Sequence, residues 1–372
     1  MLVIPKPKLL IVGAFPAEGR VIYGGIAKSC KILLESSIAN RFDIDALDSS
    51  QISNPPPKLF IRSVMAGRRL FILMYRLIFN RIDVVLIFSS DGASAIEKGV
   101  MVWMCYLFKR PALICPRAGN LISQTSRSPL MLKLIRFLYG YSTVFLCQGV
   151  KWKGYAINQL GLDKSKVKVV NNWTATEKQI ETGKNRKSEI NNTSKLIFVG
   201  WLEKYKGVFE LLHACNNLHN KGIRFRLTFV GSGNAEKAAK HFVKEHNLEK
   251  CIVFFGWANS QAVDSILEKN DIFVLPSWAE GLPNAMIEAM AAGLATVVTS
   301  VGVILDYVKD GEHAIIVPPY DVAALESALT KIILDTELRK SIASNGHQLA
   351  IDSFSVEENT KRLGDIIGMA MR

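Results

Sequence analysis

The chain has 372 residues, 49% of them hydrophobic, which predicts two domains of about 150–200 residues rather than one. Its 46 Lys and Arg residues outnumber 33 Asp and Glu residues, and the net charge of +13 favours an anionic partner such as nucleotide phosphates, nucleic acid or an acidic membrane surface. The six cysteines form no C-x-x-C pair, which argues against a disulfide framework or a zinc site. No apolar run reaches the roughly 18–20 residues of a membrane-spanning helix, and Met1–Lys8 lacks the order of a signal peptide, so we expect no integral membrane segment.

Short apolar runs alternate with helical patterns through the first half, which predicts a parallel, doubly wound sheet. The first strand, Leu9–Ala14, precedes a loop over Ala17–Gly25 and a helix that begins at Ile26. Gly24 and Gly25 leave backbone N–H groups open to a phosphate, and a simple tight turn is the alternative interpretation. Further strands are predicted at Asp83–Phe88, Ala112–Cys115, Val144–Leu146 and Val167–Val170.

Three segments of this half combine apolar and basic residues: Lys58–Arg81, Met101–Arg110 and Leu130–Tyr139. In the first, four cations fall on one narrow stripe of a helix: Lys58, Arg62, Arg69 and Arg76. Because most of the remaining positions are apolar, the pattern suits a helix lying on an anionic membrane surface. The alternative is a core helix with one solvated edge.

The segment Asn171–Ser194 is polar, has almost no apolar periodicity, and predicts a linker between domains. A second α/β series follows it. The predicted strands are Lys195–Val199, Arg224–Val230, Cys251–Phe255, Asp271–Leu275, Ala295–Thr299 and Ala314–Val317. The predicted helices are Val208–Asn220, Ala235–His246, Gln261–Lys269, Ala285–Ala292, Asp321–Asp335, Glu337–Ala350 and Val356–Met371.

The stretch Pro276–Gly293 lies between two of these strands and is the most informative part of the chain. Pro283 suits the first turn of the predicted helix, and Gly293 stands where a C-terminal cap belongs. The loop therefore lies at a carboxyl strand end, where open α/β sheets bind ligands.

Two carboxylates bracket this loop. Glu280 precedes the helix, and Glu288 lies five residues past Pro283, a rise of about 7.5 Å that is near the length of a diphosphate. One carboxylate could meet a sugar hydroxyl and the other a ribose, with phosphates at the helix N-terminus between them. The alternative interpretation is that Glu280 is an exposed acid in a loop and that Glu288 lies on a solvated helix face.

From Glu280 to Gly302 the sequence resembles the E-x7-E signature of the retaining glycosyltransferases of family 4, which adopt the GT-B fold. The resemblance implies that Glu280 contacts the donor sugar and Glu288 the nucleoside ribose. It also places Gly281, Leu282 and Pro283 in the donor site.

The stretch Val199–Gly207 resembles the family's G-R-L-x-x-x-K-G loop, whose Arg and Lys bind the diphosphate. Lys206 matches the lysine, and an ammonium there would stabilise the leaving group as its charge grows. Trp201 stands where the arginine is usual, and Lys204 or Arg117 is a candidate to compensate.

Many members of the family carry a histidine after the strand that corresponds to Ala112–Cys115, whereas this chain has Pro116-Arg117-Ala118-Gly119-Asn120. We expect Arg117 to act electrostatically or to bind an acceptor phosphate. The other donor-site candidates follow predicted strands or begin a helix: Gly24, Gly25, Gly200, Gly231, Gly233, Gly256 and Trp257. None of the six histidines has a metal-ligand spacing, so we expect no catalytic metal and no cofactor besides the nucleotide-sugar substrate.

The sequence thus predicts an α/β, GT-B protein with two Rossmann-like domains across a cleft. The expected domains are residues 1–173 with a returning C-terminal helix at 354–372, a linker at 174–194, and a nucleotide-sugar domain at 195–353. The expected activity is retaining transfer from a nucleotide-diphosphate-sugar to a lipid-linked glycan acceptor in bacterial surface polysaccharide synthesis. We expect a cytoplasmic protein, peripheral on the inner membrane through its basic-apolar helices, that binds no nucleic acid. A GT-B sugar-nucleotide epimerase and a non-catalytic subunit of a polysaccharide assembly complex are the alternatives.

Overall fold

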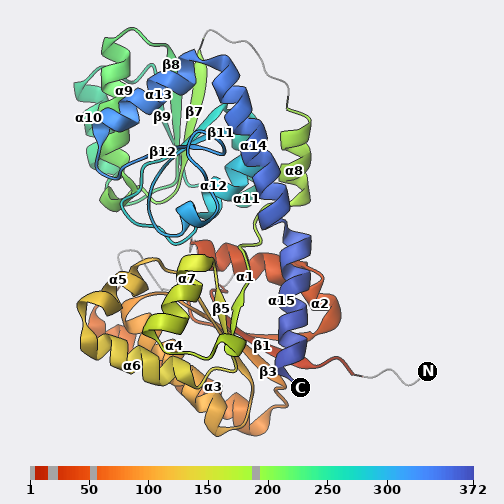
Figure 1. Ribbon diagram of the computed structural model, residues 1–372. Coiled ribbons are helices and arrows are strands. Elements are labelled where there is room, and N and C mark those ends of the chain that lie inside the picture. Colours follow the sequence, from red (N-terminus) through yellow and green to blue (C-terminus); the bar gives the residue numbers. More distant parts are fainter. Residues whose placement is uncertain (1–4, 16–23, 51–56, 187–192) are drawn as a thin grey trace. The chain divides into compact units, whose positions relative to one another are not determined.

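The computed structural model describes residues 5–15, 24–50, 57–186 and 193–372. The chain forms two compact units, residues 1–174 with 356–372, and residues 175–355 (Figure 1). Each unit contains a six-stranded, all-parallel sheet with helices on both faces. This architecture confirms the predicted class of two Rossmann-like domains.

The sheet of unit 1 has the order β2-β1-β3-β4-β5-β6. Its strands are β1 (Lys8–Gly13), β2 (Asp43–Asp48), β3 (Val84–Ser89), β4 (Ala112–Pro116), β5 (Val144–Cys147) and β6 (Val167–Val169). Five of them match predicted strands, and β2 was missed. The sequence of β2, D-I-D-A-L-D, has aspartate at three of its six positions, and β2 is a partly exposed strand at the edge of the sheet.

The helices of unit 1 cover both faces of this sheet. One face carries α1 (Gly25–Glu35), α2 (Ile38–Arg41) and α15 (Val356–Ala370). Leu363 and Ile367 of α15 are fully buried in the core beside Leu9, Leu86 and Trp173, so the end of the chain completes the first unit. The predicted loop at Ala17–Gly25 lies, apart from its last two residues, outside the described residues.

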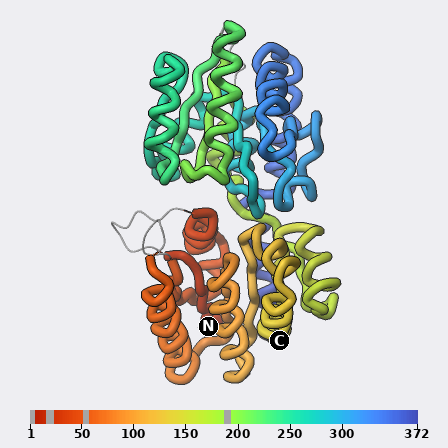
Figure 2. The backbone as a smooth tube through the Cα atoms, turned by 90° about the vertical axis from the view of Figure 1, so that its left-hand side faces the viewer, coloured from red at the N-terminus to blue at the C-terminus, as the bar shows by residue number. Residues whose placement is uncertain are grey.

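The other face carries α3 (Leu59–Phe79), α4 (Gly92–Leu107) and α6 (Pro129–Gly140), which lie side by side in this order (Figure 2). Helix α3 connects β2 to β3, α4 connects β3 to β4, and α6 lies in the connection from β4 to β5, so all three connections run in the same direction across the sheet. Because such connections are right-handed, their helices lie on a common face. Four further short helical segments are described in this unit: α5 (Asn120–Arg127), α7 (Val150–Gly154), a π-helical turn at Tyr155–Gln159 and a 3₁₀ turn at Lys164–Lys166.

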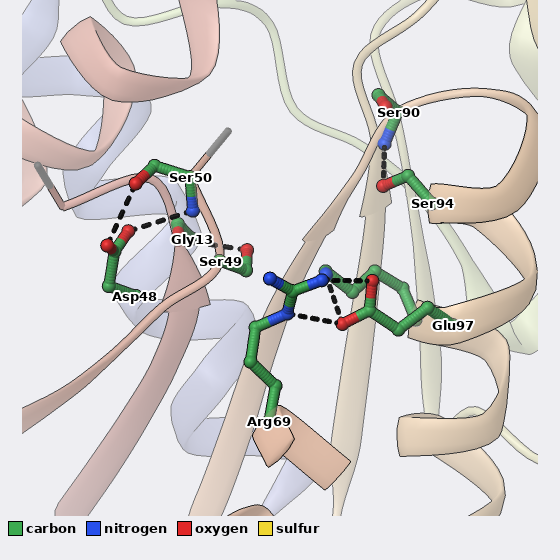
Figure 3. A network of polar contacts seen from close by, with 9 residues as sticks. Gly13, Asp48, Ser49, Ser50, Arg69, Ser90, Ser94 and Glu97 are labelled. Carbon is green, nitrogen blue, oxygen red and sulfur yellow. Dashed lines mark hydrogen bonds and ion pairs between the residues drawn. The ribbon is translucent and has the colours of Figure 1, made fainter. Parts of the chain in front are cut away.

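Two of the four cations in the basic stripe of α3, Arg69 and Arg76, face the protein, which corrects the expectation that they face a membrane, whereas Lys58 and Arg62 are exposed. Arg69 forms a two-pronged ion pair with Glu97 of α4, with Nε 2.6 Å from Oε1 (Figure 3). Arg76 donates to Asp45 of β2 at 3.1 Å and to the carbonyl of Ala46 at 2.9 Å. These cations satisfy carboxylates within the unit, and the apolar side of α3 points outward.

The sheet of unit 2 has the order β12-β11-β10-β7-β8-β9. Its strands are β7 (Ser194–Val199), β8 (Phe225–Val230), β9 (Ile252–Gly256), β10 (Ile272–Leu275), β11 (Ala295–Thr299) and β12 (Ile315–Val317). Its helices are α8 (Glu177–Lys184), α9 (Val208–Asn220), α10 (Glu236–Glu245), α11 (Ser260–Glu268), α12 (Asn284–Ala291), α13 (Val322–Leu334) and α14 (Thr336–Phe354). All strands and all helices except α8 match predicted elements within a few residues.

Helix α8 lies inside the segment for which the sequence predicts a linker. It begins with a capping box in which Thr176 and Gln179 exchange hydrogen bonds, and Gln179 also donates to Asp264 of α11 at 2.7 Å. The helix therefore packs on unit 2. Because α8 has few apolar residues, its sequence lacks the apolar periodicity from which a helix is predicted.

Among the described residues, no helix is long and apolar enough to cross a membrane.

Candidate active site in the second unit

The candidate site lies where the strand order of unit 2 reverses. Strands β7 and β10 are neighbours in the sheet. The helix that follows β7 leads to β8 on one side, whereas the helix that follows β10 leads to β11 on the other side, so the two connections run in opposite directions. In such sheets the crevice at the carboxyl ends of the two diverging strands is the usual ligand site. The loops that follow β7 and β10 carry Lys206 and Glu280, respectively. The fold thus brings both sequence-predicted residues to the switch point.

Lys206 and Glu280 form an ion pair, with Nζ 2.6 Å from Oε1 and side chains only 15% and 10% exposed. Gly207 makes this approach possible. It has φ +73°, a left-handed conformation, and a Cβ there would lie 2.0 Å from the carbonyl oxygen of Pro276. Any larger residue would therefore push the Lys206 loop away from β10.

A second set of contacts holds the Glu280 loop from its other side. Oε1 of Glu280 also accepts from Oγ of the fully buried Ser277 at 2.7 Å. Gly302 lies against the backbone of Glu280 and Gly281, where a Cβ would come within 2.3 Å of both carbonyl oxygens. The carboxylate is thus fixed by its backbone as well as by its partners, as a group that positions a substrate must be.

Trp278 ties this loop to the Lys206 loop and was missed in the sequence. Its backbone N–H donates to the carbonyl of Tyr205 at 2.7 Å, and its indole N–H donates to Glu210 of α9 at 3.1 Å. Its ring lies 4.7 Å from that of Tyr320. No sequence signal marks Trp278, because its partners come from three separate segments.

Glu288 lies in α12 and is only 4% exposed. The alternative of a solvated helix face is therefore wrong. Pro283 precedes the helix as its N-cap, one position earlier than predicted, and Leu282 and Pro283 are buried. Gly293 has φ +74° and ends the helix as predicted. A buried carboxylate needs hydrogen-bonding partners, so Glu288 is not a passive surface acid.

The other glycines of unit 2 allow backbones to pack on one another. A Cβ at Gly231 would lie 1.9 Å from the carbonyl oxygen of Gly200, and one at Gly233 would lie 2.4 Å from that of Leu202. The Gly231 N–H donates to the carbonyl of Gly256 at 2.8 Å, which links the ends of β8 and β9. The loops after β7, β8 and β9 therefore form one layer at the same sheet edge, and Trp257 is exposed there.

Arg117 belongs to unit 1 and follows β4. Its guanidinium carbon lies 4.2 Å from the centre of the Trp173 ring and 5.6 Å from that of Phe88, and Nη1 donates to Asn172. Nε and Nη2 are buried and have no hydrogen-bond partner in the part of unit 1 that the structure describes. Aromatic stacking holds the cation in place, and it retains two donors for a further acceptor. Gly24 and Gly25 also lie in unit 1, where Gly24 is the N-cap of α1.

Comparisons with known proteins find a family model that is similar to the second unit. Residues 180–349 match the model of the glycosyl transferases group 1. This match covers 170 of the 372 residues and lies within the second unit. The matched residues contain Lys206, Glu280 and Glu288, and they coincide with nearly all of unit 2.

Two curated proteins of Salmonella typhimurium and Escherichia coli are similar to parts of this chain. The putative colanic acid biosynthesis glycosyltransferase WcaL of Salmonella typhimurium is 28% identical over 180 residues, which are 46% of this chain and 44% of WcaL. This chain therefore aligns with less than half the length of that relative. The UDP-Gal:alpha-D-GlcNAc-diphosphoundecaprenol alpha-1,3-galactosyltransferase of Escherichia coli is 24% identical over 254 residues, 63% of this chain and 64% of that protein.

A solved structure shows the fold over the whole chain. The sucrose-phosphate synthase of Thermosynechococcus elongatus superposes with a TM-score of 0.78 at 16% sequence identity, covering 98% of this chain and 99% of that one. The fold class is GT-B, as the sequence resemblance implied.

Proposed function

We propose that this protein is a retaining glycosyltransferase that moves a sugar from a nucleotide-diphosphate-sugar to a lipid-linked glycan acceptor in the synthesis of a bacterial surface polysaccharide. The observation that carries the proposal is the Lys206–Glu280 pair at the switch point of unit 2, followed by the buried Glu288 in α12. The Escherichia coli relative, whose name gives UDP-Gal as donor and alpha-D-GlcNAc-diphosphoundecaprenol as acceptor, supports both the donor class and the acceptor class.

Each residue of the site receives a role in this proposal. Lys206 binds the donor diphosphate and stabilises the negative charge that grows as it leaves. Glu280 orients the donor sugar, and Glu288 binds the ribose. The glycine-lined loops after β7, β8 and β9 allow phosphates to approach backbone N–H groups, and Trp257 contacts the base.

The acceptor hydroxyl forms a bond to the anomeric carbon on the face from which the diphosphate departs, and the bond between that carbon and the diphosphate oxygen breaks. The proton of the hydroxyl passes to the departing phosphate, so no protein nucleophile is involved. Arg117 would offer its two remaining buried donors to an acceptor phosphate or act through its charge. We propose that transfer needs no bound metal, because Lys206 supplies positive charge at the diphosphate. Full activity in the presence of a chelator supports this part, and loss of activity that Mg²⁺ or Mn²⁺ restores contradicts it.

The purified protein should be incubated with a panel of nucleotide-sugars, with and without a lipid-diphosphate-linked acceptor. Transfer to the acceptor supports the proposal, and NMR of the product then reports the anomeric configuration. Inversion would exclude the retaining mechanism. Conversion of the nucleotide-sugar without acceptor would instead identify an epimerase, and no reaction with any donor would favour a non-catalytic subunit.

The donor assignment has its own test in Glu288→Ala. Loss of a hydrogen bond to a charged group should weaken calorimetric donor binding by about 1–3 kcal/mol. Glu249→Ala, in the turn before β9, is a matched acidic control that leaves the site intact. Unchanged affinity in Glu288→Ala would remove the ribose assignment.

A further inference from the structure

The outer face of unit 1 carries an unusual concentration of exposed apolar side chains. On α3 they recur at intervals of three, four and seven residues, which is one helix face: Phe60, Val64, Phe71, Met74, Tyr75 and Ile78. Phe60 is 79% exposed and Phe71 is 63% exposed. Single exposed apolar residues are ordinary on protein surfaces, but a continuous row along a 21-residue helix indicates an interaction surface.

The row continues onto the two neighbouring helices. The exposed apolar residues there are Trp103, Tyr106 and Leu107 of α4, and Leu130 and Phe137 of α6. Tyr141, just after α6, joins the two helices at the surface, with its ring 4.7 Å from that of Tyr106 and 5.2 Å from that of Phe137. Because α3, α4 and α6 lie side by side (Figure 2), these residues form one surface, here called the outer apolar face.

The charges around the outer apolar face have a single sign. Residues 57–81, 98–111 and 128–143 contain Lys and Arg but no Asp or Glu. The two α3 cations that face inward are neutralised by Glu97 and Asp45. Exposed cations also flank the apolar residues: Arg68, Lys109, Lys133 and Arg136. Lys58 and Arg62 are exposed as well, but they lie on the same stripe of α3 as Arg69 and Arg76.

We propose that the outer apolar face of α3, α4 and α6 lies on an anionic lipid bilayer, with its apolar side chains among the acyl chains and its flanking cations at the lipid phosphates. The aromatic residues Trp103, Tyr106 and Tyr75 suit the boundary between headgroups and acyl chains, because each has a large apolar ring and one polar atom. The inward ion pairs of Arg69 and Arg76 fix the helix rotation that presents the apolar side.

The alternative occupant is a second copy of this chain, and the charges argue against it. A two-fold contact would place the same acid-free surface of each copy against the other, so that cations would meet cations without a carboxylate to pair. A bilayer that contains acidic lipids supplies both the apolar medium and the negative charge. The proposal deepens the proposed function, because it rests on an acceptor whose carrier lies in the membrane.

The test compares vesicles of phosphatidylcholine alone with vesicles that also contain phosphatidylglycerol. We expect the wild-type protein to float with the anionic vesicles and to be released by added salt. The triple variant Phe60→Gln/Phe71→Gln/Ile78→Gln changes only exposed positions and should bind at least about tenfold more weakly. The control variant Leu34→Gln/Leu334→Gln/Met369→Gln removes exposed apolar side chains elsewhere and should bind like the wild type.

A wild-type protein that fails to bind anionic vesicles at low salt overturns the proposal, as does a triple variant that binds unchanged. A wild-type dimer that the triple variant converts to a monomer would assign the face to a second copy instead. Transfer to an acceptor with a short, water-soluble tail separates this inference from the proposed function. Transfer without vesicle binding would leave the glycosyltransferase proposal standing and remove only the membrane face, whereas vesicle binding without transfer would do the reverse.

Discussion

The ammonium of Lys206 lies 2.6 Å from the carboxylate of Glu280, although the two residues are 74 positions apart in the chain. Two glycines create this contact: Gly207 allows the Lys206 loop to reach Pro276, and Gly302 supports the backbone of Glu280. The pair therefore depends on backbone packing at the strand ends as much as on the attraction of its charges. A diphosphate that binds Lys206 would be oriented by the same packing.

Replacing Lys206 by Met should lower the transfer rate by about 10²–10³-fold, the usual loss when one group that stabilises developing charge is removed. Lys204→Met is the matched control, since Lys204 is an exposed cation in the same short helical turn. Steady-state kinetics with a fixed acceptor measure both variants. Comparable losses in the two would mean that Lys204 carries part of the role expected of the arginine that Trp201 replaces.

Gly207→Ala tests whether backbone packing builds the site. Any non-glycine residue in the left-handed region loses about 1–2 kcal/mol, and at Gly207 the new Cβ would also collide with the Pro276 carbonyl. Gly222→Ala shares a positive φ, +72°, but its Cβ would meet nothing within 4 Å. We expect Gly207→Ala to lose more stability in chemical denaturation than Gly222→Ala, and to lose donor affinity as well. Equal effects of the two substitutions would show that the contact with Pro276 is unimportant.

Glu97 lies between Arg69 and Lys98, and the Lys98 side chain is 2% exposed. Glu97→Gln would leave a buried ammonium without its carboxylate, so we expect a loss of about 3–5 kcal/mol in the free energy of unfolding. The exposed pair of Lys31 and Glu35 provides the control, Glu35→Gln, with little effect expected. A small loss in Glu97→Gln would mean that Lys98 is neutral in the folded protein.

The same carboxylate predicts a pH dependence of stability. Burial raises the pKa of Glu97, but the hydrogen bond from Arg69 and the charges of Lys98 and Arg69 outweigh burial and hold the pKa below its model-compound value of 4.5. A lowered pKa in the folded state stabilises the protein above pH 4.5, and this contribution disappears as the pH falls through the folded-state pKa. The wild type should thus lose its advantage over Glu97→Gln on acidification, as urea titrations at several pH values would show.

The cysteines should be almost unreactive in the folded protein. Burial raises the pKa of Cys30, Cys105 and Cys147 to about 12, so only about 10⁻⁴ of each is thiolate at pH 8. Cys251 is the one cysteine of the six that is partly exposed. We expect a thiol reagent to modify Cys251 first and the others only on unfolding, and Cys251→Ser to abolish the fast phase. Several fast thiols in the native protein would contradict the buried positions.

The sequence determined the fold class and the main residues of the site by itself, because local patterns encode them. Apolar runs of the length of buried strands gave eleven of the strands, and the spacing of Glu280, Pro283 and Glu288 marked a ligand-binding turn at a strand end. These features depend on residues a few positions apart. The edge strand β2 and helix α8 were not predicted, because most of their residues are acidic or polar and each has only a narrow apolar face.

Only the tertiary structure decided which way α3 faces and which groups hold the site. A basic stripe and an apolar stripe on one helix are both compatible with an outward or an inward orientation, and the choice depends on Glu97 and Asp45, which lie on other elements. Likewise, Trp278 acquires its role from Tyr205, Glu210 and Tyr320. Contacts between distant segments produce no periodic pattern in the sequence. Their interaction energy is gained only when the folded sheet brings the partner residues together.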